Sequence, residues 1–287
     1  MTSGFSAALK QAQAQISAHL DLRLQNTDQL HQAMGYALRG GKMLRGFLVL
    51  ESARLHDVPE SAAIEAALAI ECIHAYSLVH DDLPCMDDDD LRRGQPTLHR
   101  KWDEATAVLA GDSLQTLAFE LLAREEVGPH AVTLIRTMAV AAGKDGMVSG
   151  QMLDIAAETA DTPLTLEQIT TLQARKTGCL IEWSACAGAR LAGADPDPLR
   201  QYAQALGLAF QIADDILDIE GDAATVGKAV RKDAEAGKAT FVSLLGLEGA
   251  KTRAHELAEL ACAALAPYGA AGDTLKDAAR FVISRDS

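Results

Sequence analysis

The sequence is short of aromatic residues, prolines and positive charge, and each shortage narrows the choice of fold and function. Only 4% of the 287 residues are aromatic, and Ala and Leu dominate, which favours helices over sheet. The 8 prolines form no linker, so we expect a single domain over residues 1–287. A net charge of −14 argues against a nucleic-acid partner, because tracking phosphates requires a basic face.

Cysteine pairs and long uncharged apolar runs are also missing. The number of cysteines is odd and no C-x-x-C pair occurs, so we expect reduced thiols that pack as small apolar side chains. No uncharged apolar run reaches about 18 residues, and no basic segment with an apolar run and cleavage site opens the chain. The sequence therefore predicts a cytoplasmic protein without a membrane span.

Apolar residues recur at helical spacing along almost the whole chain. Phe5, Ile16 and Leu20 belong to a first amphipathic helix, and Gly, Pro and Asp clusters separate the later ones. Thr165 and Gln168 have the spacing of a capping box. The pattern predicts an all-α bundle with helices over about 28–38, 44–55, 61–83, 103–124, 129–156, 166–191, 198–219 and 239–266.

An acidic cluster, HDDLPCMDDDD at residues 80–90, follows a long apolar helix. Carboxylates at a helix C-terminus oppose the macrodipole and repel one another, so they require a positive partner. Asp81 and Asp87 would point to different faces of an uninterrupted helix. Pro84 cannot continue that helix, so we expect the chain to turn and bring Asp87 back beside Asp81.

Carboxylate oxygens are ligands for hard cations, so this cluster favours Mg²⁺ or Ca²⁺. A calcium loop of the EF-hand type is excluded. Counted from Asp81, Met86 and Arg92 occupy the positions where that loop needs Gly and Glu.

The second acidic cluster is Asp214, Asp215 and Asp218, inside an apolar run over residues 206–219. Asp214 and Asp218 are i, i+4 neighbours and share a helix face without any kink. Charges in such a run are costly unless they are paired or bound to metal. Either cluster alone is compatible with a solvated acidic face. Two clusters on apolar helices, each followed by cations, favour a metal site.

Basic residues accompany both clusters and also open another helix. Carboxylates would hold Mg²⁺, the metal would hold a diphosphate, and Lys and Arg would hold the remaining phosphate oxygens. Free N–H groups at a helix start also attract anions. The candidates are Lys42 and Arg45 in GGKMLR, Arg92 and Arg93 after the first cluster, Lys176 and Thr177 in KTG, and Lys228 and Lys238 after the second.

These motifs together resemble the bacterial farnesyl diphosphate synthases of the trans-prenyltransferase (polyprenyl synthetase) family. The matching segments are GGKMLR at 40–45, IHAYSLVHDDLPCMDDDDLRRGQPT at 73–97, GQMLD at 150–154, KTG at 176–178, FQIADDILD at 210–218, GK at 227–228 and GKATF at 237–241. The resemblance implies an isoprenoid-synthase bundle around a deep central cavity, and a homodimer. The implied chemistry is head-to-tail condensation of isopentenyl diphosphate with an allylic diphosphate.

The resemblance also assigns roles to individual residues. It implies three Mg²⁺ ions, with Mn²⁺ as an alternative, on Asp81, Asp87 and Asp214, supported directly or through water by Asp82, Asp215 and Asp218. The allylic diphosphate would lie on Arg92, Lys176, Lys238 and Lys228. Isopentenyl diphosphate would lie on Lys42, Arg45, His74 and Arg93. Thr177 and Gln211 would direct oxygen dipoles at the allylic cation.

Two positions depart from the family pattern. Gly46 stands where the family commonly has proline, and Phe241-Val242 replaces Tyr-Pro. Neither removes a proposed ligand, and both bear on the rigidity of loops at the site.

Product length depends on residues just before the first cluster. Tyr76 and Ser77 precede Asp81 by five and four residues, so on a helix they lie about 7.5 and 6 Å from the metal site. A growing prenyl tail would meet them, and the resemblance implies a C15 product. The alternatives are a geranyl or geranylgeranyl diphosphate synthase, a terpene cyclase, and a catalytically silent subunit of a heteromeric synthase.

Overall fold

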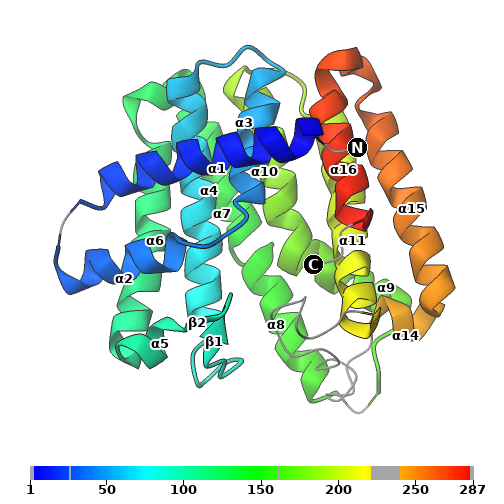
Figure 1. The fold of residues 1–287 in the computed structure, drawn as a ribbon, viewed down its shortest axis with the longest axis horizontal. Coiled ribbons are helices and arrows are strands. Elements are labelled where there is room, and N and C mark those ends of the chain that lie inside the picture. The colour runs from blue at the N-terminus through cyan, green and yellow to red at the C-terminus, as the bar shows by residue number, and fades with distance from the viewer. Residues whose placement is uncertain (1–2, 26, 161, 221–239, 285–287) are drawn as a thin grey trace.

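The protein is described by a computed structural model that covers residues 3–25, 27–160, 162–220 and 240–284. Within these ranges it is a helical bundle with one two-stranded hairpin (Figure 1). The first half contains α1 (Ser3–Arg23), α2 (Gln29–Leu38), α3 (Leu44–Arg54), α4 (Glu60–Asp81), β1 (Leu91–Arg92), β2 (Gln95–Pro96), α5 (Leu98–Lys101), α6 (Glu104–Leu122), η1 (Glu125–His130) and α7 (Ala131–Ala142). The second half contains α8 (Met147–Glu158), α9 (Leu166–Gln173), η2 (Ala174–Gly178), α10 (Cys179–Leu191), α11 (Asp197–Glu220), α14 (Phe241–Leu245), α15 (Leu247–Ala264), η3 (Ala266–Gly272) and α16 (Asp273–Ser284).

Helix α4 forms the centre of the bundle. Its small residues Ala66, Ala67 and Ala69 are completely buried, which lets α3, α6 and α10 pack closely around it. Among the described helices it is the one with the length and mean hydropathy (1.5) of a membrane span, but 83% of that stretch is buried inside the fold. Its apolar character therefore belongs to the protein core.

Helix α1 lies across the bundle, whereas most of the longer helices run along it (Figure 1). It contacts α3, α4 and α16. Phe5, Ile16 and Leu20 are buried, which confirms the predicted amphipathic first helix. α1 therefore packs across one face of the bundle, in front of α3 and α4 (Figure 1).

The predicted all-α class and most of the predicted helices are confirmed, and three details differ. The helix predicted over 129–156 is wrong, because residues 143–146 interrupt it between α7 and α8. The stretch 166–191 is interrupted by a π-helical turn, η2. Gly246, at φ 71°, separates α14 from α15. The sequence did not predict the hairpin or α16. The capping box of Thr165 and Gln168 is present.

All five cysteines are free thiols. The buried ones are Cys72, Cys186 and Cys262, whereas Cys179 is half-buried and Cys85 is exposed. Reduced thiols were expected, and most of them pack as small apolar side chains.

Candidate active site

The chain turns back immediately after α4, as the proline predicts. α4 ends at Asp81, and the Asp87 N–H donates to the Asp81 carbonyl oxygen at 2.9 Å. The Met86 N–H donates to the Leu83 carbonyl oxygen at 2.8 Å and closes the turn around Pro84. A backbone hydrogen bond thus joins the two aspartates that an uninterrupted helix would have separated.

Asp81 lies in a partly desolvated position beside charges of both signs. Burial raises its pKa from 3.8 to about 6; nearby Lys176 opposes this shift, and the Asp87 carboxylate adds to it. The first cluster therefore combines two mutually repelling carboxylates with a lysine from η2, far away in the sequence.

Asp82 has a different environment from its neighbour. It is buried, and the Arg92 Nε donates to both of its carboxylate oxygens, at 2.7 and 2.9 Å. Arg92 Nη2 lies 2.5 Å from Asp82 Oδ1, so the pair is multiply bonded. The hairpin of β1 and β2 carries Arg92 to this position. Asp82 thus holds the guanidinium of Arg92 in place.

The second cluster lies near the C-terminal end of α11, which continues through Asp214 and Asp218 without a break. Their shared face is confirmed. Asp215 is buried, and its Oδ2 accepts the Phe241 N–H at 2.7 Å, while Gln211 Nε2 lies 3.4 Å from Oδ1. Asp215 therefore fastens the start of α14 to α11.

The Phe241-Val242 departure does not loosen this region. Both side chains are buried, and Thr240 and Ser243 form a reciprocal capping box at the start of α14. Together with the bond to Asp215, these contacts fix the backbone at the start of α14.

The carboxylates of the two clusters suit magnesium ions that are bound by the protein and a substrate together. In the described part of the chain, no group of three or more His, Cys, Asp or Glu side chains could hold a metal ion by itself. Mg²⁺ usually keeps several waters and binds one or two carboxylates plus substrate phosphates. The half-buried Asp81 and the exposed Asp87, with cations close by, suit that type of binding.

The KTG motif lies on the π-helical turn η2, which packs against α8 and α11. Lys176 Nζ donates to Asp154 Oδ2 at 2.7 Å. A Cβ on Gly150 would lie 2.1 Å from the Lys176 backbone nitrogen, so only glycine permits this approach. π-turns often mark functional positions in helices. Asp154 is the last residue of the GQMLD segment, and no role was predicted for it from the sequence.

Arg45, His74 and Arg93 lie near one another at the start of α3. Burial, together with the guanidiniums of Arg45 and Arg93, holds the pKa of His74 well below its ordinary value, so the imidazole is neutral at pH 7. Arg45 Nε is buried and has no hydrogen-bond partner among the described residues. Arg93 donates to the Arg39 carbonyl oxygen at 3.3 Å, and its guanidinium lies over Gly41. Such a group of donors suits an anion.

Glu71, near the start of α3, was not predicted from the sequence as a residue of this site. Glu71 is buried on α4, and its Oε1 accepts the Gly46 N–H at 2.7 Å. The signal that could have found it is a carboxylate within an apolar helix, three residues before His74.

Of the remaining candidate site residues, some lie within the described part of the chain and two lie outside it. Lys42 is exposed just before α3, and Thr177 is half-buried on η2. Tyr76 is buried with its ring edge-on to that of His80, with centroids 5.8 Å apart, and Ser77 Oγ donates to the His74 carbonyl oxygen at 2.9 Å. Lys228 and Lys238 lie outside the described residues.

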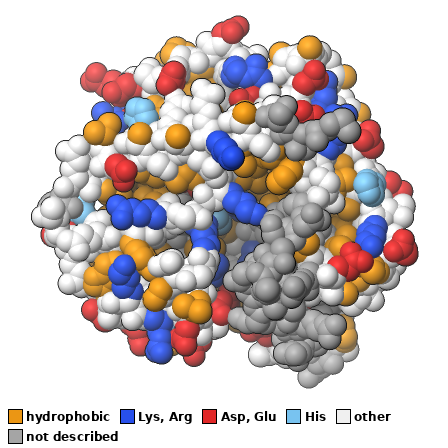
Figure 2. All heavy atoms as spheres, viewed as in Figure 1, with side chains coloured by type: hydrophobic (Ala, Val, Ile, Leu, Met, Phe, Trp, Pro, Cys, Tyr) orange, Lys and Arg blue, Asp and Glu red, His pale blue; other side chains and the backbone are white. Residues whose placement is uncertain are grey.

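A space-filling view places cations around a hollow in the middle of one face. Figure 2 shows Lys and Arg side chains gathered there. Despite the net charge of −14, positive charge is therefore locally concentrated.

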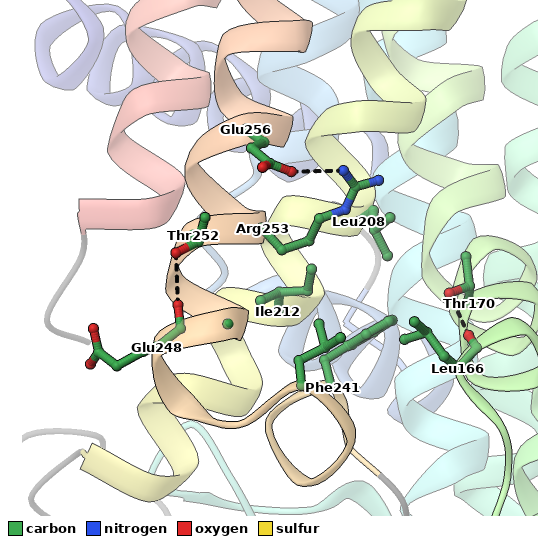
Figure 3. Close-up of a pocket in the computed structure, with 11 residues that line it drawn as sticks. Leu166, Thr170, Leu208, Ile212, Phe241, Glu248, Thr252, Arg253 and Glu256 are labelled. Carbon is green, nitrogen blue, oxygen red and sulfur yellow. Dashed lines mark hydrogen bonds and ion pairs between the residues drawn. The ribbon is translucent and has the colours of Figure 1, made fainter.

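A separate cavity of about 520 Å³ lies between α9, α11, α14 and α15 (Figure 3). Leu208, Ile212 and Phe241 line it, and Arg253 at its edge donates to Glu256 at 3.0 Å. None of the described candidate residues lines this cavity. Leu208 and Ile212 point to a different face of α11 from Asp214 and Asp218, so the cavity is distinct from the aspartate site.

Comparisons with known proteins agree with this geometry. A family model described as polyprenyl synthetase matches residues 27–266. A farnesyl diphosphate synthase of Haemophilus influenzae is 42% identical over a 297-residue alignment that covers 99% of each chain. An FPP/GFPP synthase of Zymomonas mobilis has 43% identity and a TM-score of 0.89, over 99% of this chain and 100% of the other. A Helicobacter pylori geranyltransferase, complexed with magnesium and isoprenyl diphosphate, has 35% identity and a TM-score of 0.79 over 96% of each chain.

Proposed function

Because this chain belongs to the polyprenyl synthetase family, we propose that it condenses isopentenyl diphosphate with dimethylallyl and geranyl diphosphate to make farnesyl diphosphate. It is a trans-prenyl diphosphate synthase with geranyltranstransferase activity, and it uses magnesium. The observation that carries the proposal is the pairing of each acidic cluster with cations from distant helices. Lys176 is close enough to Asp81 for its charge to oppose the rise that burial causes in the pKa of that carboxyl. Asp214 likewise opposes the fall that burial causes in the pKa of Arg45.

The allylic diphosphate is assigned to the first cluster. Asp81, Asp87 and Asp214 would hold the Mg²⁺ ions. Arg92, kept in place by Asp82, would bind phosphate oxygens together with Lys176. Lys176 donates to Asp154 in this structure, so it would exchange that partner for phosphate. The proposed contributions of Lys228 and Lys238 lie outside the described residues.

The second diphosphate is assigned to the start of α3. Lys42, Arg45 and Arg93 would neutralise isopentenyl diphosphate, and neutral His74 would add a hydrogen bond. A terpene cyclase needs no such second set of cations. Both acidic clusters are intact, which argues against a catalytically silent subunit.

The reaction then proceeds by ionisation and condensation. The allylic C–O bond breaks, and the electron pair leaves with the diphosphate; bound magnesium supplies charge stabilisation for that leaving group. Oxygen dipoles of Thr177 and Gln211 would face the cation, and an apolar cavity would exclude water. The isopentenyl double bond attacks the cation and forms the new C–C bond. The released diphosphate accepts the proton that is finally lost.

The finer assignments are three magnesium ions, a homodimer and a cytoplasmic location. We propose the dimer from the family resemblance; Val108 and Leu109, neighbours on α6 that are 40% and 57% exposed, are apolar side chains that such an interface would cover. Light scattering at the assay concentration measures the oligomeric state.

Incubation of the purified protein with Mg²⁺, labelled isopentenyl diphosphate and dimethylallyl diphosphate should yield mainly a C15 diphosphate. Chromatographic sizing of the products checks this. An absence of condensation would overturn the proposed activity. A dominant C10 or C20 product would overturn the assigned chain length and keep the reaction type.

Magnesium binding should weaken as the pH falls through about 6. The pKa of Asp81 is raised to about 6 in the fold, so the metal-free fold holds this proton more tightly than the unfolded chain does. In the metal-free protein, the contribution of protonated Asp81 to the free energy of unfolding is therefore fully present below about pH 4. It is lost as the pH rises through about 6. Mg²⁺ needs the ionised carboxylate and must compete with this proton in acid.

We expect Mg²⁺ with inorganic pyrophosphate to raise the Tm at neutral pH, and the increase to shrink below about pH 6. Thermal unfolding measured across this range provides the test. Asp81→Asn is the control, because pyrophosphate itself titrates and its own pH dependence will persist in the variant. An identical pH dependence in both proteins would contradict the role of Asp81.

A further inference from the structure

The loop that carries Lys42 and Arg45 contains a strained backbone. Met43, the N-cap of α3, has φ 49° and ψ 38°, in the left-handed region that non-glycine residues rarely adopt. In the described structure its side chain makes no capping hydrogen bond. Such strain persists only where the surrounding structure over-determines the conformation. The contacts that impose it should therefore come from other elements.

One face of α1 supplies these contacts. Gln13 Nε2 donates to the Lys42 carbonyl oxygen at 2.8 Å, and Ser17 Oγ donates to Met43 Sδ at 3.8 Å. Ile16, between them on the same face, is completely buried. Its Cδ1 would lie 2.5 Å from a Cβ at Gly46, so α1 approaches the first turn of α3 as closely as a glycine permits.

Helix α4 holds the same turn from another direction. Glu71 accepts the Gly46 N–H, one of the N–H groups that the first turn of a helix leaves without an intrahelical partner. A proline at this position has no N–H to donate. The departure from the family pattern at Gly46 therefore adds an anchor to the loop.

We propose that Gln13 is a positioning residue for the isopentenyl diphosphate subsite, acting through the carbonyl oxygen of Lys42. This inference rests on the proposed function, which assigns Lys42 and Arg45 to that diphosphate. Helix α1 precedes the residues matched by the family model, so the brace is formed by a segment outside that match. Gln13 itself touches the backbone of the loop.

The expected consequence is specific to one substrate. Without the Gln13 bond, the left-handed turn at Met43 loses a restraint, and part of the population leaves the geometry that binds isopentenyl diphosphate. A binding-competent state that is only partly populated raises the apparent Kd in proportion. The allylic site, built from α4, the hairpin and η2, keeps its contacts.

Gln13→Ala should raise the KM for isopentenyl diphosphate about three- to tenfold, the range expected for one neutral hydrogen bond. The KM for geranyl diphosphate and kcat should stay within about twofold, and the Tm should be unchanged. Gln13→Glu keeps the shape but replaces the donor with an acceptor facing the Lys42 carbonyl oxygen. It should raise that KM at least as much.

Gln15 offers matched controls on the same helix. Its Nε2 donates to Glu60 Oε1 at 2.5 Å, away from the loop, so Gln15→Ala and Gln15→Glu should leave both KM values unchanged. Amide hydrogen exchange of residues 40–46 should accelerate in Gln13→Ala and stay unchanged in Gln15→Ala.

Two outcomes would overturn the proposal. One is a KM for isopentenyl diphosphate in Gln13→Ala that equals that of Gln15→Ala. The other is a parallel rise in both KM values together with a lower Tm, which indicates general loosening. The unmodified enzyme is assayed alongside. If it forms no farnesyl diphosphate, the proposed function fails, whereas normal turnover with unchanged variants refutes only the role of Gln13.

Discussion

Asp214→Ala is expected to lower kcat about a hundred- to a thousandfold, while the Tm stays within about two degrees of the unmodified protein. The assigned role of Asp214 is to hold magnesium against the departing diphosphate, and losing one electrostatic stabiliser of a transition state costs about 10²–10³ in rate. Asp214 is half-exposed and is not part of the buried core, so we expect no large loss of stability. Single-turnover kinetics with saturating substrates and circular dichroism melting measure the two quantities.

The neighbouring Asp215 provides a contrast within the same motif. It is buried and accepts the Phe241 N–H, so Asp215→Ala leaves a buried donor unsatisfied, at a cost of about 1–3 kcal/mol of unfolding free energy. The first variant should thus lose rate and the second should also lose stability. Near-normal kcat in Asp214→Ala would remove this residue from the metal site.

Tyr76→Ala should shift the main product from C15 to C20 or longer. Tyr76 is buried on α4, five residues before Asp81, and therefore lies about 7.5 Å along the helix from the first cluster. A prenyl tail that extends from the diphosphate toward this ring stops when it meets the ring. Truncation to Ala removes the ring and lengthens the space. Mass spectrometry of the dephosphorylated products, with geranyl diphosphate as the primer, measures the distribution.

Tyr76→Phe is the matched control, because it keeps the ring and removes only the hydroxyl. It should retain the C15 product. The shift should appear in chain length with little change in the KM for isopentenyl diphosphate, whose assigned cations lie on other elements. An unchanged C15 product in Tyr76→Ala would place the end of the cavity elsewhere.

Much of the first cluster could be predicted because its geometry is local. Pro84 lacks an N–H, so the helix had to end and the chain had to turn, and the bond between Asp87 and Asp81 is the result. The shared face of Asp214 and Asp218 follows from helical spacing alone. The break between α7 and α8 was missed because the apolar pattern continues through it, although Gly143 and Gly146 are present.

The different contacts of adjacent aspartates could not be predicted. Asp81 and Asp82 are the same residue type and adjacent in the sequence. Arg92 on the hairpin nevertheless bonds to Asp82, whereas Asp81 is within electrostatic range of Lys176. Strands of two residues are too short to show an alternation of apolar and polar side chains, so the hairpin could not be predicted from the sequence.

The sequence by itself determined the helical class, the positions of both acidic clusters and the turn at Pro84. Each of these depends on residues within a few positions of one another, where backbone sterics and helical spacing decide. Only the tertiary structure decided which carboxylate meets which cation, that Asp215 anchors Phe241, and that Gln13 reaches the carbonyl of Lys42. The Asp215 and Gln13 contacts join residues 26 and 29 positions apart, and their geometry is set by the packing of whole helices.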